Sequence, residues 1–471
     1  MQGIFYNRRR ELEFLLNKFQ SARPELLIFR GRRRVGKTFL LQEFARKVNS
    51  LYFMGTISSH RDQLAVFSQT ASHCFNDPLL KTRPFASWDE FFLYLHQNIE
   101  KRTAVIIDEY PYLVESYPGL STILQKYWDE YFIANPNLFL VLNGSALSMM
   151  ERETLYGKAP LYGRRTGQWL VKPFNVLENQ HFFSTHSLIR SIEWYAISGG
   201  VPFYSQILSA YNTPLKAIEK EILTFGQTLF EEVEFLLRGE FRNPRSYFPI
   251  LKAIALGSRK FGEISSKTGY DKANLTKYLS TLTELHLIRR EVPITEEHPA
   301  KSKKGLFFLN DHFMNLWFRF VFPYQSELEA GQIKSIYEKI VKPQFDYFVS
   351  QVCETIIREL LVLNCFGLNF KFNRVGRFWN KNTEIDIFGY TEDDDTVAGE
   401  IKWSKSPVTA HEIKTLLNKQ RYIASFVRGN LRWLFISKSG FEKAITKMHP
   451  EIILIDLKDY TIDNIPDIGS L

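Results

Sequence analysis

The octapeptide Gly31–Arg32–Arg33–Arg34–Val35–Gly36–Lys37–Thr38 fits the pattern G-x-x-x-x-G-K-[ST] of a phosphate-binding loop. An apolar run, residues 26–29, precedes it and predicts a buried parallel strand, and apolar residues at helical spacing follow it. The two glycines allow the backbone to fold around a phosphate, and the loop amides and the helix N-terminus would point at the anion. Lys37 is expected to reach the β and γ oxygens of ATP, and the Thr38 hydroxyl to bind Mg²⁺. All eight residues and the following Phe39 are predicted ATP contacts; the alternative is an ordinary glycine-rich turn beside a basic patch.

Two carboxylates follow a second apolar run. Residues 104–107 predict another buried strand, and Asp108 and Glu109 come directly after it. Ligands bind at the carboxyl end of strands in open α/β sheets. Asp108 would hold Mg²⁺, through water or directly, and Glu109 would polarise the attacking water as general base. The alternative is a solvated strand end.

Three further positions predict contacts to the nucleotide or to the attacking water. The apolar run 138–142 predicts a strand between the two earlier ones, and Asn143 or Ser145 at its end could orient the water, unless they only form a turn. Arg164 could stabilise charge in the transition state, from the same chain or a neighbouring one, or be a solvated turn residue. Arg8, before the first predicted helix, would lie over the adenine or be a surface arginine.

Composition excludes several classes of protein. The 471 residues suffice for about three domains, and the net charge of +9 favours a polyanionic partner, with a solvated basic surface as the alternative. The cysteines Cys74, Cys353 and Cys365 form no C-x-x-C pair, which argues against a disulfide framework or zinc site. There is neither a signal-peptide core nor an apolar run of roughly 18 residues, so we expect no membrane partner and a cytoplasmic location.

Taken together with Asn7-Arg8, Gly163-Arg164 and the run 199–202, these motifs resemble the archaeal-type ATPase family, AAA-like relatives of the signal-transduction ATPases. The resemblance covers residues 1–235. It implies an ATP-driven conformational switch, often with slow hydrolysis. It also implies that the Gly-x-Pro element ending at Pro202 packs near the adenine, which makes Pro202 a further ATP contact.

The middle of the chain predicts a winged-helix module. Three helices are expected over residues 249–257, 261–268 and 275–285, followed by a strand pair over 288–292 and 305–309. The last of these helices could enter a DNA major groove. Its candidate contacts are Lys272, Asn274, Lys277 and Tyr278. Alternatively, the module only packs against or relays to its neighbours.

The last third contains a second set of carboxylates. The strands 384–388 and 397–403 are expected to pair as a hairpin and bring together Asp386, Glu400 and Lys402. Two carboxylates can hold a Mg²⁺ that activates water, and a lysine can stabilise the developing charge. The alternative is the charge alternation of a half-exposed strand.

This spacing resembles the PD-(D/E)XK nuclease pattern. The resemblance implies that Glu354, on a predicted helix over 343–363, is the acidic residue of the preceding helix in that fold and shares the metal. It also implies a nucleic-acid partner, DNA more than RNA. Many such domains bind nucleic acid without cutting it.

The sequence therefore predicts an α/β chain of four segments: a parallel-sheet P-loop ATPase core (1–180), a helical subdomain (181–240), a winged helix (241–310) and a restriction-endonuclease-like α/β domain (311–471). The first hypothesis is an ATP-regulated enzyme acting on nucleic acid. The second is a signalling or scaffold ATPase, a homo-oligomer whose assembly follows its nucleotide state. A third is a DNA-binding switch that does not cleave.

Overall fold

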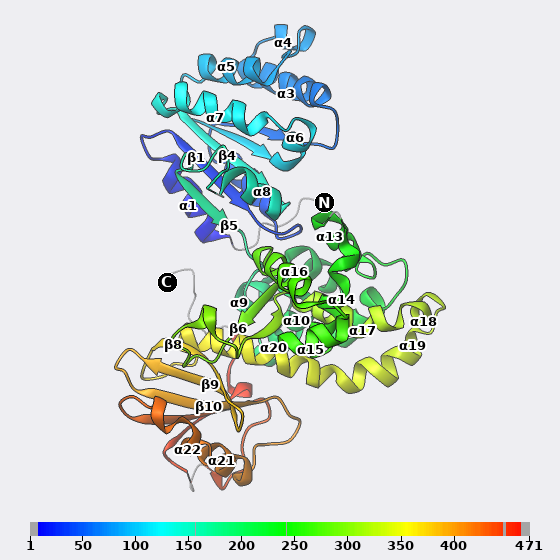
Figure 1. The fold of residues 1–471 in the computed structure, drawn as a ribbon, viewed down its shortest axis with the longest axis vertical. Helices are drawn as coiled ribbons and strands as arrows, with labels where there is room; N and C mark the ends of the chain where they lie inside the picture. The colour runs from blue at the N-terminus through cyan, green and yellow to red at the C-terminus, as the bar shows by residue number, and fades with distance from the viewer. Residues whose placement is uncertain (1–7, 156, 242, 446–448, 463–471) are drawn as a thin grey trace. The chain divides into compact units, whose positions relative to one another are not determined.

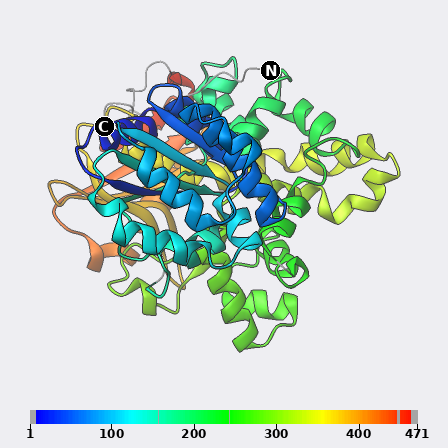
Figure 2. The same cartoon turned by 90° about the horizontal axis from the view of Figure 1, so that it is seen from above.

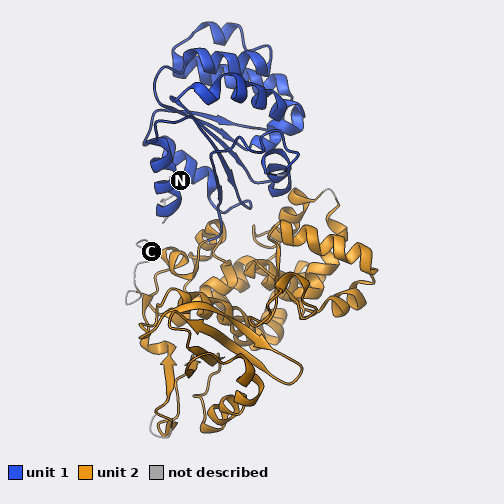
Figure 3. Cartoon of the chain, turned by 60° about the vertical axis from the view of Figure 1, so that its left-hand side comes forward, with its two compact units in different colours: residues 1–173 blue, residues 174–471 orange. Residues whose placement is uncertain are grey.

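The computed structural model describes residues 8–155, 157–241, 243–445 and 449–462. The chain divides into two units, Met1–Pro173 and Phe174–Leu471 (Figure 3). Asn7 of the Asn7-Arg8 motif lies outside the described residues, and Arg8 precedes the first described helix.

A parallel sheet forms the centre of the first unit. Within the described residues its strand order is β2-β3-β4-β1-β5, and every neighbouring pair is parallel. The strands are β1 (Glu25–Arg30), β2 (Ser50–Met54), β3 (Thr103–Asp108), β4 (Leu138–Gly144) and β5 (Gly167–Leu170). The strands expected over residues 26–29, 104–107 and 138–142 are confirmed as β1, β3 and β4, and β4 lies between the other two, as predicted for the strand that ends at Asn143.

Helices cover both faces of this sheet (Figures 1 and 2). They are α1 (Arg9–Phe19), α2 (Lys37–Ala45), α3 (His60–Phe75), α4 (Leu79–Thr82), α5 (Trp88–Asn98), α6 (Tyr110–Ser116), α7 (Leu120–Glu130) and α8 (Leu147–Thr154). Successive strand residues point to opposite faces. On β1, Leu27 and Phe29 pack in one core with α1 and α2, while Leu26 and Ile28 pack in the other with α3, α5 and α7. Burial on both faces explains why the strands read as continuous apolar runs.

The second unit begins with helices. They are α9 (Val176–Asn179), α10 (Leu188–Ser198), α11 (Pro202–Leu208), α12 (Pro214–Ala217), α13 (Glu232–Glu240), α14 (Phe248–Ala255), α15 (Phe261–Thr268), α16 (Lys272–Glu284), α17 (His312–Phe320), α18 (Gln325–Glu329), α19 (Ile333–Ile336) and α20 (Lys342–Val362). Between α16 and α17, β6 (Ile288–Glu291) pairs antiparallel with β7 (Leu306–Leu309). The expected helix–turn–helix and strand pair are confirmed.

A second sheet follows, with order β12-β11-β10-β9-β8 in the described residues. Its strands are β8 (Phe372–Trp379), β9 (Glu384–Thr391), β10 (Thr396–Lys402), β11 (Leu431–Ser437) and β12 (Ile452–Asp456), accompanied by α21 (Ala410–Leu417) and α22 (Gln420–Ile423). Strands β8, β9 and β10 are antiparallel, whereas β10, β11 and β12 are parallel. The expected hairpin is therefore confirmed as β9 and β10. The architecture is mixed α/β, with a parallel-sheet unit and a separate C-terminal α/β sheet.

Among the described helices, none combines the length and the apolar character needed to cross a bilayer.

One buried histidine links the second unit's stability to pH. His312 begins α17, and its ring lies 5.5 Å from that of Tyr195, centroid to centroid. Burial, reinforced by the positive charge of Arg289 and opposed by Asp311, lowers the pKa of His312 from 6.5 to about 4. Between those two values the unfolded chain binds more protons than the folded one, so stability is present above pH 6.5 and is lost as the pH falls.

We expect acidification from pH 7 to pH 5 to remove about 2 kcal/mol of unfolding free energy through His312 alone. In His312→Phe this part of the loss should disappear. Urea unfolding followed by tryptophan fluorescence at the two pH values measures it, with exposed His411→Asn as the control. An equal loss in wild type and His312→Phe would contradict the assignment.

Candidate nucleotide-binding site and carboxylate cluster

The loop between β1 and α2 has a backbone that only particular residues allow. Arg34 and Gly36 have positive φ angles of +71° and +88°. At Gly31 an added Cβ would lie 2.4 Å from the Val171 carbonyl oxygen, so only glycine fits there. Val35 is fully buried and fixes the loop to the core. The loop is thereby held in one conformation at the N-terminus of α2, where backbone amides favour an anion.

Lys37 lies across this loop. Its side chain is buried and its ammonium donates to the Arg32 carbonyl oxygen at 2.8 Å. The Val35 carbonyl accepts a hydrogen bond of 2.8 Å from Arg8, whose guanidinium also pairs with Glu11 at 2.9 Å. Arg8 therefore contacts the loop backbone, and its predicted contact with adenine stays a prediction.

Asp108, the last residue of β3, is fully buried in a hydrogen-bonded network. Its carboxylate accepts hydrogen bonds from the Tyr52 hydroxyl at 2.5 Å, the Glu109 amide at 2.8 Å and the Asn143 side-chain amide. Burial, together with the negative charge of Asp108, raises the pKa of Tyr52 far above its usual value, so Tyr52 remains a donor. The buried Asn143 Oδ1 has no hydrogen-bond partner within the described residues. The sequence does not predict a role for Tyr52, because tyrosine is common in β-strands.

Glu109 is held by the end of β4. It has a φ of +50° and is the N-cap residue that precedes α6. Its carboxylate accepts from the Ser145 hydroxyl at 2.9 Å and from the Ser145 amide at 3.3 Å. Glu109 and Ser145 therefore contact each other at the carboxyl edge of the sheet, as Asp108 and Asn143 do.

Arg164 and Pro202, the two remaining predicted contacts, each have surroundings of their own in the structure. The Arg164 guanidinium makes hydrogen bonds of 2.7 to 3.0 Å to the Asp129 carboxylate, and another of 3.1 Å to the Pro160 carbonyl. Pro202 begins α11 in the second unit, after a turn in which the Gly200 carbonyl accepts from the Phe174 amide at 2.8 Å. The roles of Arg164 and Pro202 remain predictions.

The residues present fit a triphosphate and its metal ion. The glycine at position 31 leaves a cradle that a Cβ would close, and Lys37 bonds to its own loop where a phosphate oxygen would be a stronger acceptor. The unsatisfied Asn143 Oδ1 and the buried Asp108 supply oxygens of the kind Mg²⁺ or its bound water prefers. No group of three or more His, Cys, Asp or Glu side chains in the described part of the chain could hold a metal by itself.

Comparisons with known proteins identify the family of this chain. A family model described as an ATPase domain predominantly from Archaea matches residues 5–202. The uncharacterized protein MJECL04 of Methanocaldococcus jannaschii is 33% identical over 466 residues, which cover 97% of this chain and 100% of that relative. The chain belongs to this archaeal ATPase family. It is a P-loop ATPase.

Other comparisons cover parts of this ATPase. A second family model, described as Archaea bacterial proteins of unknown function, matches residues 317–416. The uncharacterized ATP-binding protein MJ0423 of the same organism is 52% identical over 46 residues, 9% of this chain and 78% of that relative. A Walker-type ATPase structure from Pyrococcus abyssi has a TM-score of 0.51 at 21% identity and covers 67% of this chain and 96% of that one, which shows a shared fold.

A carboxylate cluster lies in the second unit of the ATPase. Glu354 on α20, Asp386 on β9 and Glu400 on β10 interact electrostatically. Burial, with the charge of Asp386, raises the pKa of Glu354 to about 7 and that of Glu400 to about 8. Asp386 also accepts from the Ile401 amide at 3.1 Å. The hairpin thus places Asp386 beside Glu400, and α20 brings Glu354 within electrostatic reach of Asp386.

Cations from other elements surround the cluster. Lys419 contacts the Glu400 carboxylate and donates to the Glu384 carbonyl at 2.7 Å. Arg377 on β8 lies 3.7 Å from the Glu354 carboxylate. Arg358 donates to the Asp386 carbonyl at 3.0 Å.

The prediction that Lys402 joins this cluster is wrong. The Lys402 ammonium pairs with Glu412 at 2.9 Å. The cause is α21, whose Thr409 cap places Glu412 in the first turn, near the end of β10. Lys419, which the short sequence motif does not include, contacts Glu400 in its place.

Proposed function

We propose that this ATPase is a nucleotide-driven switch, in which binding and hydrolysis of ATP in the first unit control a nucleic-acid-binding second unit. The observation that carries the proposal is that the loop of the buried Lys37 follows β1 and the Asp108–Glu109 pair comes at the end of β3, so that both lie at the carboxyl edge of one parallel sheet. The name of the relative MJ0423, an ATP-binding protein, supports the choice of nucleotide.

Each residue of the site has a role in this proposal. The amides of residues 31–38 and the Lys37 ammonium bind the phosphates, and Thr38 and Asp108 hold Mg²⁺, which would neutralise phosphate charge. Asn143 orients the attacking water with its free Oδ1. Glu109 accepts the proton of that water once it leaves Ser145.

Three arginine and proline contacts complete the proposed nucleotide site. Arg8, already bound to the loop carbonyl of Val35, would reach the adenine side. Pro202 would pack near the adenine. Arg164 would leave Asp129 to stabilise transition-state charge, in the same subunit or in a neighbour of a homo-oligomer.

The nucleic-acid partner is supported by the middle of the second unit. Helix α16 follows a turn at Gly269 and leaves Lys272, Asn274 and Lys277 exposed, while Tyr278 packs against Tyr247 and Tyr270. We propose that these elements form a winged helix. An exposed helix with such side chains suits the major groove of DNA better than the deep, narrow one of RNA.

The carboxylate cluster supports a nuclease-like C-terminal domain. Asp386 and Glu400 on one hairpin, with Glu354 on a helix, do not form a complete metal site by themselves, so in this proposal water and the phosphodiester oxygens would complete the coordination of Mg²⁺. In this proposal the cation that stabilises developing charge is Lys419, because Lys402 is paired elsewhere.

A second candidate is a scaffold ATPase whose nuclease-like domain does not cleave. It is favoured by the cations around the cluster, because Lys419, Arg377 and Arg358 already neutralise the carboxylates that a metal would need. In that function the nucleotide state controls assembly.

A nuclease assay with ATP and Mg²⁺ distinguishes the nucleic-acid-cleaving switch from the non-cleaving scaffold. We expect wild type to cleave DNA and Asp386→Ala to lose at least about a hundredfold in rate, because Asp386 would hold the metal. Exposed Asp393→Ala on the adjoining turn is the matched control. Cleavage that persists in Asp386→Ala would contradict the nuclease assignment. Absence of cleavage with ATP-dependent oligomerisation would favour the scaffold.

A further inference from the structure

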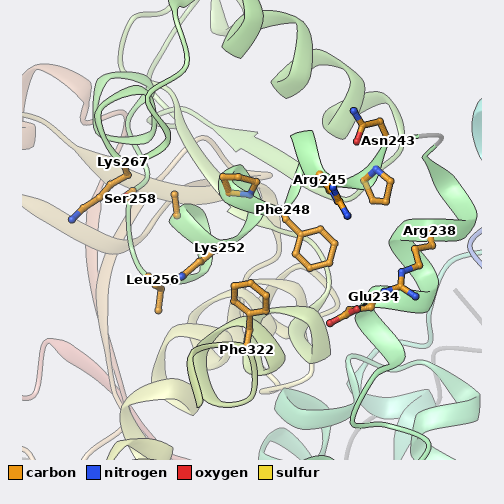
Figure 4. Close-up of a pocket in the computed structure, with 13 residues that line it drawn as sticks. Glu234, Arg238, Asn243, Arg245, Phe248, Lys252, Leu256, Ser258, Lys267 and Phe322 are labelled. Atoms are coloured by element: carbon orange, nitrogen blue, oxygen red, sulfur yellow. Dashed lines mark hydrogen bonds and ion pairs between the residues drawn. The ribbon is translucent and has the colours of Figure 1, made fainter. Parts of the chain in front are cut away.

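A large pocket opens in the helical part of the second unit, and none of its lining residues belongs to either site described above (Figure 4). Its volume is about 1160 Å³. Its walls come from α13, the 3₁₀ turn Pro244–Ser246, α14, the C-terminal half of α15 and Phe322. Small-molecule pockets usually measure about 300–1000 Å³, so this one is large enough for a segment of a longer ligand.

The pocket carries an excess of positive charge. Its charged lining residues are Arg238, Arg245, Lys252, Lys267 and Glu234. Glu234 is already neutralised, because it pairs with Arg238 at 2.8 Å and accepts from Gln325 at 3.3 Å. For Arg245, Lys252 and Lys267, the described residues provide no carboxylate partner within ion-pair distance. Three cations are therefore available to an anionic ligand.

Two phenyl rings lie among these cations. Phe248 and Phe322 both line the pocket, are half-buried, and have ring centroids 5.8 Å apart. The Lys252 ammonium lies 5.1 Å from the Phe322 centroid. The Phe248 ring is supported from behind by Phe318, at 5.6 Å between centroids. The two rings are inclined to each other by 47°, so each would offer its own face to a planar group.

We propose that this pocket binds a nucleic-acid strand with unpaired bases. Proteins that bind single strands combine cations along the backbone with aromatic faces for the bases. Here Arg245, Lys252 and Lys267 would contact successive phosphates, and a base would stack on Phe248 or Phe322. A duplex fits less well, because its bases are stacked inside and its surface is convex. The proposal rests on the nucleic-acid partner proposed above, but uses residues other than the exposed cations of α16.

The test is fluorescence anisotropy of a labelled 12-nucleotide oligo(dT) with the full chain. We expect the double variant Arg245→Glu/Lys267→Glu to bind at least tenfold more weakly than wild type. The slope of the logarithm of its binding constant against the logarithm of the salt concentration should decrease in magnitude by about 1.4, because each phosphate contact to a single strand contributes about 0.7 to that slope. Both side chains are exposed, so folding should persist, which an unchanged urea unfolding curve followed by tryptophan fluorescence would verify. Exposed Lys339→Glu is the matched control and should bind as wild type does.

Three results would overturn the inference. One is unchanged oligo(dT) binding by the double variant. Another is displacement of the oligonucleotide by free dTMP at equal concentration, which would make the pocket a mononucleotide site. The third is that a 12-base-pair duplex binds wild type as tightly as oligo(dT) does, and that the double variant weakens duplex binding by the same factor. If wild type bound neither single nor double strands, the proposed nucleic-acid partner itself would fail, and the inference with it.

Discussion

Lys37→Ala is expected to reduce ATP turnover by at least about a hundredfold, which corresponds to roughly 3 kcal/mol of lost transition-state stabilisation. The Lys37 ammonium is buried and held on the Arg32 carbonyl of the phosphate loop, where it would meet an entering phosphate. Steady-state phosphate release with saturating ATP and Mg²⁺ measures the loss.

Lys47→Ala is the matched control. Lys47 follows the same helix, is exposed, and pairs with Glu43 at 3.2 Å on the surface. Its removal should leave turnover within about twofold of wild type, because an exposed ion pair contributes little. Turnover that persists in Lys37→Ala would show that hydrolysis occurs at another site.

Glu109→Gln is expected to slow hydrolysis by about 10²–10⁴-fold while leaving ATP binding almost unchanged. The amide matches the shape of the carboxylate, and its oxygen can still accept from Ser145, so the local structure should remain. It cannot accept a proton from water. The change should therefore lower the rate constant of hydrolysis measured in single-turnover experiments, while the binding constant for ATP stays the same.

Glu115→Gln serves as the control for this second change, because Glu115 is an exposed residue of α6, the helix that Glu109 precedes. It should hydrolyse ATP at the wild-type rate. A Glu109→Gln protein that hydrolyses ATP normally would remove Glu109 from the mechanism; one that fails to bind ATP would give it a structural role instead.

The sequence predicted the parts of these sites that depend on local pattern. Apolar runs buried on both faces placed β1, β3 and β4 correctly, and the polar residues at their ends follow from strand polarity alone. The register of the β9–β10 hairpin likewise follows from a short turn, and it brings Asp386 near Glu400.

Contacts between residues far apart in sequence could not be predicted in this way. Tyr52 donates to Asp108 across 56 positions, and nothing in the strand around it differs from an ordinary half-buried strand. Lys419 replaces Lys402 beside Glu400 because of the path of the chain after β10, which no motif encodes. Arg164 matched its motif, yet its pairing with Asp129 depends on how α7 packs.

The most direct test of the central claim is a crystal structure of the ATPase with Mg²⁺ and a non-hydrolysable ATP analogue. We expect the triphosphate within the amides of residues 31–38, the Lys37 ammonium moved from the Arg32 carbonyl to the phosphates, and the metal between Thr38 and Asp108. A triphosphate bound elsewhere, with Lys37 still on Arg32 and the Asp108 network unchanged, would contradict the account.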